Sequence, residues 1–252
     1  MRIYLSGING IKKWLQDGAL KPEQIFALES FWSLTDWEIP FISRFADFML
    51  DSGAFSFQNA IKMAQNWDNY VDRYADFIVS NDIKLFFELD IDSIVGLKET
   101  ERLRRRLESR TGRSPIIVWH PGRGKEYWLD MIKEYPYIAV GGIAIKERPL
   151  SWYEKIFPWM ITTAHEGGAK IHGLGYTRID GLKRYRFDSI DSTTWTVGSR
   201  FGEISRFKDG RMERISYREN GIKTKIVRDR EALSLYNFRE WLKMQRYAEL
   251  YL

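Results

Sequence analysis

Acidic residues at the ends of apolar segments are the side chains of this sequence best suited to chemistry. Three apolar segments, each short enough to be a strand, are closed by acids. The acids are Asp51, Asp90, Asp188 and Asp191. Strands that end on carboxylates bring them to the rim of a sheet, where such acids can bind a polar ring and attack a carbon atom.

The elements that must position these acids alternate between strands and helices over the first two hundred residues. The predicted strands cover residues 3–5, 24–28, 48–50, 84–89, 116–119, 137–140, 170–171 and 187–190. Apolar residues at helical spacing and helix stop signals predict helices over residues 59–81, 97–110 and 151–166. Eight such units fit an α/β fold, a (β/α)8 TIM-like barrel, with an open doubly wound sheet as the alternative.

The pattern changes near the C-terminus. Residues 203–207, 211–217 and 222–227 predict three antiparallel strands, because Asp-Gly and Asn-Gly turns separate them. Between residues 200 and 230, basic side chains outnumber acidic ones by five, which equals the net charge of +5 of the whole chain. We therefore expect a basic β insert over 201–228 and a closing helix over 231–252, within a single domain of residues 1–252. A basic surface fits a polyanion, most often nucleic acid, with a merely solvated surface as the alternative.

Composition excludes several classes of protein. The absence of cysteine excludes disulfides, thiol catalysis and zinc sites made of thiolates. No apolar run is long enough to cross a bilayer, and the N-terminus predicts a strand rather than a signal peptide, so we expect no membrane association and a cytoplasmic location. His120 and His172 could surround a metal ion together with Asp51 and Asp90. Because these histidines lack the close spacing of metal-binding motifs, we expect no metal and no cofactor.

Glycine and histidine also follow predicted strands. Gly141 and Gly142 come directly after strand 137–140, where missing side chains would let a flat ligand lie on backbone amide donors. A tight turn between strand and loop is the alternative reading. His120 and His172 follow two other strands, and a histidine in such a place is more often a hydrogen-bonding residue than a metal ligand.

Five motifs resemble, in the same order, those of the tRNA-guanine transglycosylases. They are Asp51-Ser52-Gly53-Ala54-Phe55-Ser56, Leu89-Asp90-Ile91, Val140-Gly141-Gly142-Ile143-Ala144, His172-Gly173-Leu174-Gly175 and Asp188-Ser189-Ile190-Asp191-Ser192. Arg200 stands where the family has an arginine after the last motif. His120 replaces the family's glutamine, and the family's zinc site of cysteines and histidine is absent. The chain looks most like the zinc-free phage and bacterial branch that inserts 7-deazaguanines into DNA, which for a phage protein means the host cytoplasm.

The resemblance implies a role for each of these residues. Asp191 is expected to be the nucleophile that forms an ester with the sugar C1′, and Asp51 the general acid and base. Asp90 is expected to accept hydrogen bonds from N1–H and the 2-amino group of guanine. The other expected substrate contacts are His120, Gly141, Gly142, Ile143 and His172, with Phe55 and Tyr176 stacking on the base.

The expected partners are nucleic acid, with DNA favoured over tRNA, and a free 7-deazaguanine base such as 7-cyano-7-deazaguanine. The expected phosphate contacts are Arg200, Lys208, Arg211, Arg214, Lys223 and Lys225. Three alternatives stay open: a tRNA-guanine transglycosylase, a DNA glycosylase or glycoside hydrolase-type barrel in which water resolves the sugar intermediate, and a non-catalytic barrel that only binds nucleic acid. The oligomeric state is open too, because the missing zinc module is compatible with a monomer.

Overall fold

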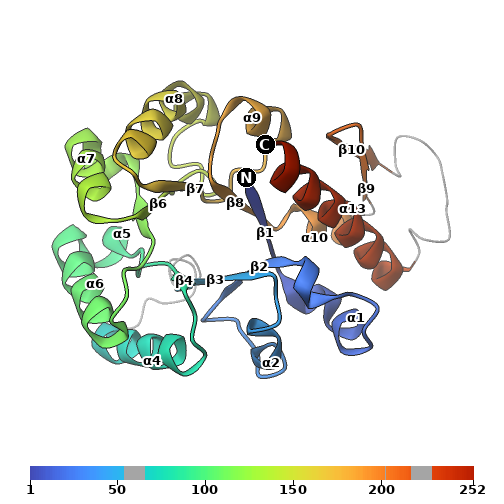
Figure 1. Cartoon of the computed structure of the whole chain (residues 1–252), viewed down its shortest axis with the longest axis horizontal. Coiled ribbons are helices and arrows are strands. Elements are labelled where there is room, and N and C mark those ends of the chain that lie inside the picture. Colours follow the sequence, from blue (N-terminus) through green and yellow to red (C-terminus); the bar gives the residue numbers. More distant parts are fainter. Residues whose placement is uncertain (54–65, 202, 217–228) are drawn as a thin grey trace. The chain divides into compact units, whose positions relative to one another are not determined.

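The computed structural model describes residues 1–53, 66–201, 203–216 and 229–252. The chain forms two compact units: unit 1 comprises Met1–Ala27, Phe45–Asp47 and Gly175–Leu252, and unit 2 comprises Leu28–Arg44 and Phe48–Leu174. Eight parallel strands alternate with helices along the chain, so the fold is of the α/β, TIM-like class, as the sequence predicts (Figure 1). The assignment of residues 1–252 to a single domain stays a prediction.

Unit 1 contains both ends of the chain. Its strands are β1 (Arg2–Ser6), the first residues of β2 (Phe26–Ser30), β8 (Ser189–Ser192), β9 (Glu203–Lys208) and β10 (Arg211–Ser216). Its helices are α1 (Lys12–Gln16), α9 (Ile179–Arg184), α10 (Thr194–Phe201) and α13 (Arg230–Tyr251). β1 and β8 pair in parallel, with Tyr4 opposite Asp191. This register sets the predicted nucleophile near the C-terminal end of its strand.

Unit 2 holds the middle of the alternating pattern. Its strands are β3 (Asp47–Asp51, from its second residue), β4 (Leu85–Phe86), β5 (Ile117–Trp119), β6 (Tyr137–Val140) and β7 (Lys170–Gly173). Its helices are α2 (Ile39–Ile42), α4 (Trp67–Ser80), α5 (Asp92–Val95), α6 (Leu97–Thr111), α7 (Gly124–Glu134) and α8 (Leu150–Glu166). β5, β6 and β7 pair in parallel, and a bridge from Phe87 to Ile116 links the end of β4 to the start of β5. The ends of four strands therefore follow one another within this unit.

Several strands begin or end away from their predicted positions. β2 begins two residues late because Pro22–Gln24 form a 3-10 turn, which the fixed φ of proline favours. β8 begins two residues late, because its pairing starts only where the Arg2 N–H donates to the Asp188 carbonyl. Asp188 thus lies immediately before β8, whereas the predicted strand 187–190 implied a position near the strand end, beside Asp191.

Helices α4 and α6 are joined by a ladder of ion pairs. The pairs are Asp68–Arg102 at 2.9 Å, Asp72–Arg106 at 2.7 Å and Asp76–Arg110 at 2.6 Å. Acids and arginines recur every fourth residue on the two helices, which places each set on one helical face. Exposed pairs of this kind each contribute less than about 1 kcal/mol, so the ladder fixes the register of the helices more than it stabilises them. It also neutralises most of the arginine charge of α6.

The basic insert begins with the predicted hairpin. β9 and β10 pair antiparallel, and the turn between them has φ values of +51° at Asp209 and +71° at Gly210. Two successive positive φ values characterise the type I′ turn that an Asp-Gly sequence favours. The third predicted strand, residues 222–227, lies outside the described residues.

Helix α13 closes unit 1 with polar side chains that bind backbone groups. The Asn237 amide accepts from the Ser205 N–H at 2.8 Å and donates to the Glu203 carbonyl at 3.0 Å. The Gln245 amide accepts from the Phe26 N–H at 3.0 Å and donates to the Gln24 carbonyl at 2.9 Å. Each amide thus makes the pair of hydrogen bonds that a neighbouring strand would make.

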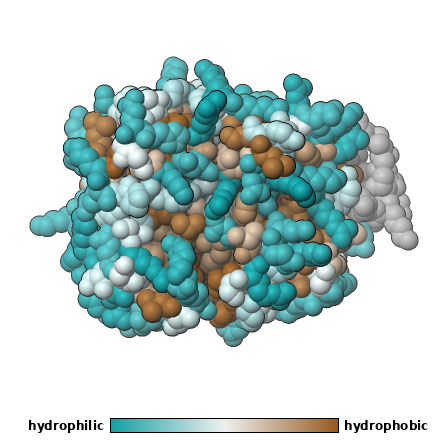
Figure 2. Space-filling view, in the orientation of Figure 1, coloured by the Kyte–Doolittle hydropathy of each residue, from teal (hydrophilic) through white to brown (hydrophobic). Residues whose placement is uncertain are grey.

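Hydrophilic side chains dominate the face shown in Figure 2. None of the helices in the described ranges combines the length and the apolar composition that a bilayer span requires.

Candidate active site

Three polar side chains meet at the strand ends of unit 2. Asp90 follows β4, His120 follows β5, and Glu147 lies in the loop after β6. His120 Nε2 lies 2.7 Å from Asp90 Oδ2, and His120 Nδ1 lies 2.7 Å from Glu147 Oε2. The His120 side chain is 12% exposed, and each of its two ring nitrogens has a carboxylate as its partner.

The two carboxylates determine the charge of His120. Burial alone lowers the pKa of its imidazole, but the charges and hydrogen bonds of Asp90 and Glu147 outweigh burial and raise this pKa from 6.5 to about 9. At neutral pH the ring is consequently an imidazolium that donates from both nitrogens. The ring thus donates one charge-assisted hydrogen bond to Asp90 and one to Glu147.

Gly141 and Gly142 fit tightly around this group. A Cβ on Gly141 would lie 2.8 Å from His120 Nε2, so any side chain here would displace the imidazole. Gly142 has a φ of +78°, and a Cβ on it would collide with the Glu147 carboxylate and the Tyr153 hydroxyl. Only glycine satisfies both positions without moving the polar group.

The backbone amides after β6 differ in what they donate to. The Gly141 N–H donates to the Trp119 carbonyl at 2.8 Å and so continues the sheet. The N–H groups of Gly142 and Ile143 have no acceptor in the part of the chain that the structure describes. Gly142 and Ile143, two of the predicted substrate contacts, therefore have amide donors that no described group occupies.

Asp90 is also part of a buried network of ion pairs. The Arg123 side chain is 1% exposed and donates to Glu88 at 2.9 Å, to Asp92 at 2.8 Å and to Asp90 at 3.5 Å. Glu88, which is fully buried, also accepts from Arg104 and from the Val118 N–H, each at 2.9 Å. These cations compensate the charge of the acids and fix the end of β4.

Sequence reasoning missed Glu147, Arg123 and the role of Glu88. Glu147 was detectable as the first acid after the Gly141-Gly142 pair, and Glu88 as an acid inside the apolar segment 85–89. Nothing in the sequence marked Arg123 out from the many other arginines.

Asp51 closes a tight turn at the end of β3. Its Oδ1 accepts from the Gly53 N–H at 2.5 Å, and Gly53 has a φ of +85°. A Cβ on Gly53 would lie 2.5 Å from the Trp32 Cβ, so the turn requires glycine. The Tyr70 hydroxyl donates to the Ser52 carbonyl at 2.6 Å. Asp51 is half-buried and held in one orientation, as a positioned acid and base requires.

Asp191 is oriented within unit 1. Its Oδ1 accepts from the Gly175 N–H at 2.6 Å, and Gly175 has a φ of +71°. The buried Trp195 fixes the neighbouring strand end, because its indole N–H donates to the Ser6 carbonyl at 2.8 Å. The Gly175 hydrogen bond therefore fixes one oxygen of the Asp191 carboxylate in place.

The two sets of predicted residues fall in different units. Unit 1 holds Asp191 and Tyr176, and unit 2 holds Asp51, Asp90, His120, Gly141, Gly142, Ile143 and His172. His172 is fully buried, with its ring edge-on to Phe87 at 5.3 Å, and Tyr176 is 1% exposed and packs against Tyr185 and Phe187. Both rings therefore contribute to the core, and their contact with a ligand stays a prediction.

The predicted nucleic-acid contacts lie in unit 1. Arg200 is part of α10, and Lys208, Arg211 and Arg214 are exposed on the hairpin. Phe55, Lys223 and Lys225 lie outside the described residues. Among the described residues, the structure brings together no cluster of three or more acids or histidines suited to a metal ion.

Comparisons with known proteins give no family for this chain. No protein-family model matches it, and no curated protein does. Similar solved structures include the carboxyl transferase domain of Rhizobium etli pyruvate carboxylase with pyruvate, at 13% identity and a TM-score of 0.48, and with oxalate, at 12% and 0.49. In both cases 98% of this chain matches 48% of the other, so the chain spans about half of their length. At this similarity they assign no activity to this chain.

The charge of His120 predicts how stability depends on pH. Its pKa of about 9 in the folded chain lies above the ordinary 6.5, so the stabilisation is complete below pH 6.5 and is lost as pH rises through 9. We expect unfolding experiments to show a loss of about 2–3 kcal/mol across this window. The His120→Gln variant should lack this loss. A His120 NMR titration with a midpoint at or below 6.5 would show that the two carboxylates do not hold the proton.

Proposed function

We propose that this chain is a base-exchange transglycosylase that replaces guanine in nucleic acid, DNA rather than tRNA, with a free 7-deazaguanine. The observation that carries the proposal is the set of hydrogen-bonding groups around His120. The Asp90 carboxylate is an acceptor, and the Gly142 and Ile143 amides are donors without a described acceptor. Guanine offers two kinds of donor, N1–H and the 2-amino group, beside one acceptor, O6, so its edge complements this set.

The amide donors after β6 fit recognition of guanine rather than adenine. Adenine presents an amino donor where guanine has O6, and the N–H groups of Gly142 and Ile143 would disfavour another donor. A base that cannot donate to Asp90 forgoes the hydrogen bonds that guanine makes with this carboxylate and is therefore bound more weakly.

Asp191 is assigned the covalent chemistry. Its carboxylate attacks the sugar C1′, the C1′–N9 bond breaks, and the electron pair stays on guanine N9, which takes a proton from Asp51. The deazaguanine N9–H then returns a proton to Asp51 while N9 attacks C1′ and the ester breaks. Two displacements retain the configuration at C1′ and regenerate both acids. The support for these roles is the ordered set of sequence motifs, the Gly175 hydrogen bond to Asp191 and the rigid turn at Asp51.

Mass spectrometry of the product nucleosides tests the proposal. The protein is incubated with DNA and 7-cyano-7-deazaguanine, and the digested DNA is analysed for the deazaguanine nucleoside. We expect this nucleoside together with released guanine in equal amounts. Released guanine with abasic sites would indicate a glycosylase instead, and modification of tRNA alone would indicate the tRNA branch. A protein that binds DNA but releases guanine neither from DNA nor from tRNA would refute the enzyme assignment.

A further inference from the structure

Basic side chains of the two units differ in whether acids neutralise them. In unit 2, the arginines of α6 form ion pairs, as in the ladder with α4. In unit 1, five basic side chains on α9 and the hairpin have no carboxylate within ion-pair distance among the described residues: Lys183, Arg184, Lys208, Arg211 and Arg214. The same two elements carry four acids, Asp180, Glu203, Asp209 and Glu213, of which Glu213 pairs with Arg206 and has its pKa lowered by that hydrogen bond and, more weakly, by the charge of Lys208. With six basic residues against four acids, α9 and the hairpin are net positive.

A column of aromatic rings lies beside this charge. The Phe207 ring centroid lies 5.5 Å from that of Tyr247, which in turn lies 5.0 Å from that of Tyr251. Tyr251 is 71% exposed. The column therefore begins under the hairpin and ends on a ring open to solvent.

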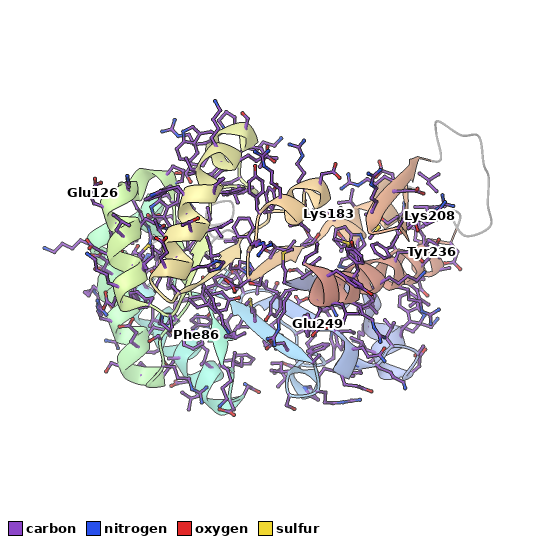
Figure 3. The ribbon with its side chains drawn as sticks, turned by 45° about the horizontal axis from the view of Figure 1, so that its top comes forward. Phe86, Glu126, Lys183, Lys208, Tyr236 and Glu249 are labelled. Atoms are coloured by element: carbon purple, nitrogen blue, oxygen red, sulfur yellow. The ribbon has the colours of Figure 1, made fainter. Side chains whose placement is uncertain are left out.

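The hairpin turn lies against both an aromatic ring of the column and a basic side chain. A Cβ on Gly210 would lie 2.7 Å from the Tyr247 hydroxyl and 3.3 Å from Lys183 Nζ, so turn, ring and cation are in contact. Lys183 Nζ lies 5.9 Å from the Tyr247 ring centroid, within reach of a cation–π interaction. Figure 3 labels Lys183 on α9 and Lys208 at the end of β9, two of the elements that meet here. We call the six residues Phe207, Tyr247, Tyr251, Lys183, Lys208 and Arg211 the aromatic–basic surface.

We propose that the aromatic–basic surface binds single-stranded nucleic acid, with one unpaired base stacked on Tyr251 and the adjoining phosphates on Lys208 and Arg211. Proteins that bind single strands combine a positive track for the backbone with rings on which bases stack. Polyanion binding alone would use the charge but leave the exposed ring unused, and duplex DNA would offer Tyr251 no open base face. The inference rests on the proposed function, because base exchange needs its target base out of the helical stack.

Fluorescence anisotropy with a labelled oligothymidylate of about ten nucleotides tests the surface, since single-strand sites span a few to some sixteen nucleotides. We expect Tyr251→Ala to weaken binding about 5- to 100-fold and Tyr251→Trp to retain it, because stacking needs only a ring. Leu250→Ala is the matched control, since Leu250 is the exposed neighbour in the same helix, and it should bind as the parent does. An abasic oligomer of the same length should bind parent and Tyr251→Ala equally.

Salt dependence separates the phosphate contacts from stacking. Lys208→Ala and Arg211→Ala should each reduce the slope of log affinity against log salt by about 0.7, the contribution of one phosphate contact on a single strand. Tyr251→Ala should leave the slope unchanged.

Three results would overturn the inference: equal affinity of the Tyr251→Ala and parent proteins, equal or tighter binding to duplex of the same length, and preferential binding to vesicles of anionic phospholipid. These binding assays contain no deazaguanine. Single-strand binding as expected without base exchange would therefore refute the proposed function alone, whereas base exchange that is unaffected in Tyr251→Ala, with unaltered single-strand affinity, would refute the surface alone.

Discussion

The Asp191→Asn variant is expected to lose base exchange by at least about a thousandfold, because an amide cannot form the ester with C1′ and removal of a nucleophile has effects of this size or more. Binding of nucleic acid should stay within about twofold of the parent, because the substitution changes only one side chain. The amide oxygen of asparagine can still accept the hydrogen bond from the Gly175 N–H. Release of labelled guanine measures exchange, and anisotropy measures binding.

Asp188→Asn is the matched control for Asp191→Asn. Asp188 precedes β8, whereas Asp191 is near its C-terminal end, and in TIM-like folds catalytic groups come from the C-terminal ends of strands. We expect the Asp188 variant to exchange guanine at a rate within about threefold of the parent, in line with a surface-type substitution. Full exchange by Asp191→Asn, or an equal loss in both variants, would remove the covalent role of Asp191.

Glu88→Ala is expected to destabilise the protein by about 3–5 kcal/mol, the usual cost of removing one partner of a buried ion network. The substitution leaves Arg104, Arg123 and the Val118 N–H without their shared acceptor in a site that excludes water. The free energy of unfolding, measured by urea denaturation, should fall by this amount. The affinity for guanine should fall too, because Arg123 then has only Asp90 and Asp92 as partners.

An exposed acid on α6, the helix that carries Arg104, provides the comparison for Glu88→Ala. Glu99 pairs with Arg102 at 2.7 Å on the surface of α6, and its removal should cost less than about 1 kcal/mol. A Glu88→Ala protein as stable as Glu99→Ala would mean that Arg104 and Arg123 find other acceptors, and the network would then not be what fixes the end of β4.

The alternation of elements was readable from the sequence because its signals are local. Apolar runs of strand length, the helical spacing over residues 97–110 and the Asp209-Gly210 turn are each set by neighbouring residues, and the structure contains the corresponding α6 and hairpin. Strand ends were less predictable. β4 has only two residues because Phe86, Phe87 and Glu88 exchange hydrogen bonds alternately with Leu50 and Ile116, which are distant in the chain.

The chemistry of the site was only partly readable. The sequence places Asp90, His120 and the two glycines at strand ends, but it cannot show that His120 carries a proton, because Asp90 and Glu147 lie 30 and 27 residues away in the chain. The same reason hid Arg123. Residues that act through partners from other elements are visible only once the strands have been brought together.

The side-chain amides of α13 have a consequence for the behaviour of this protein in solution. An uncovered strand border recruits strands of other molecules, which is how many chains begin to aggregate. Asn237 occupies the border of β9 with hydrogen bonds that end at the amide and cannot be propagated to another molecule. A protease cut that released α13 would therefore leave a fragment prone to form intermolecular sheets, and α13 protects the intact protein against fibrous self-association.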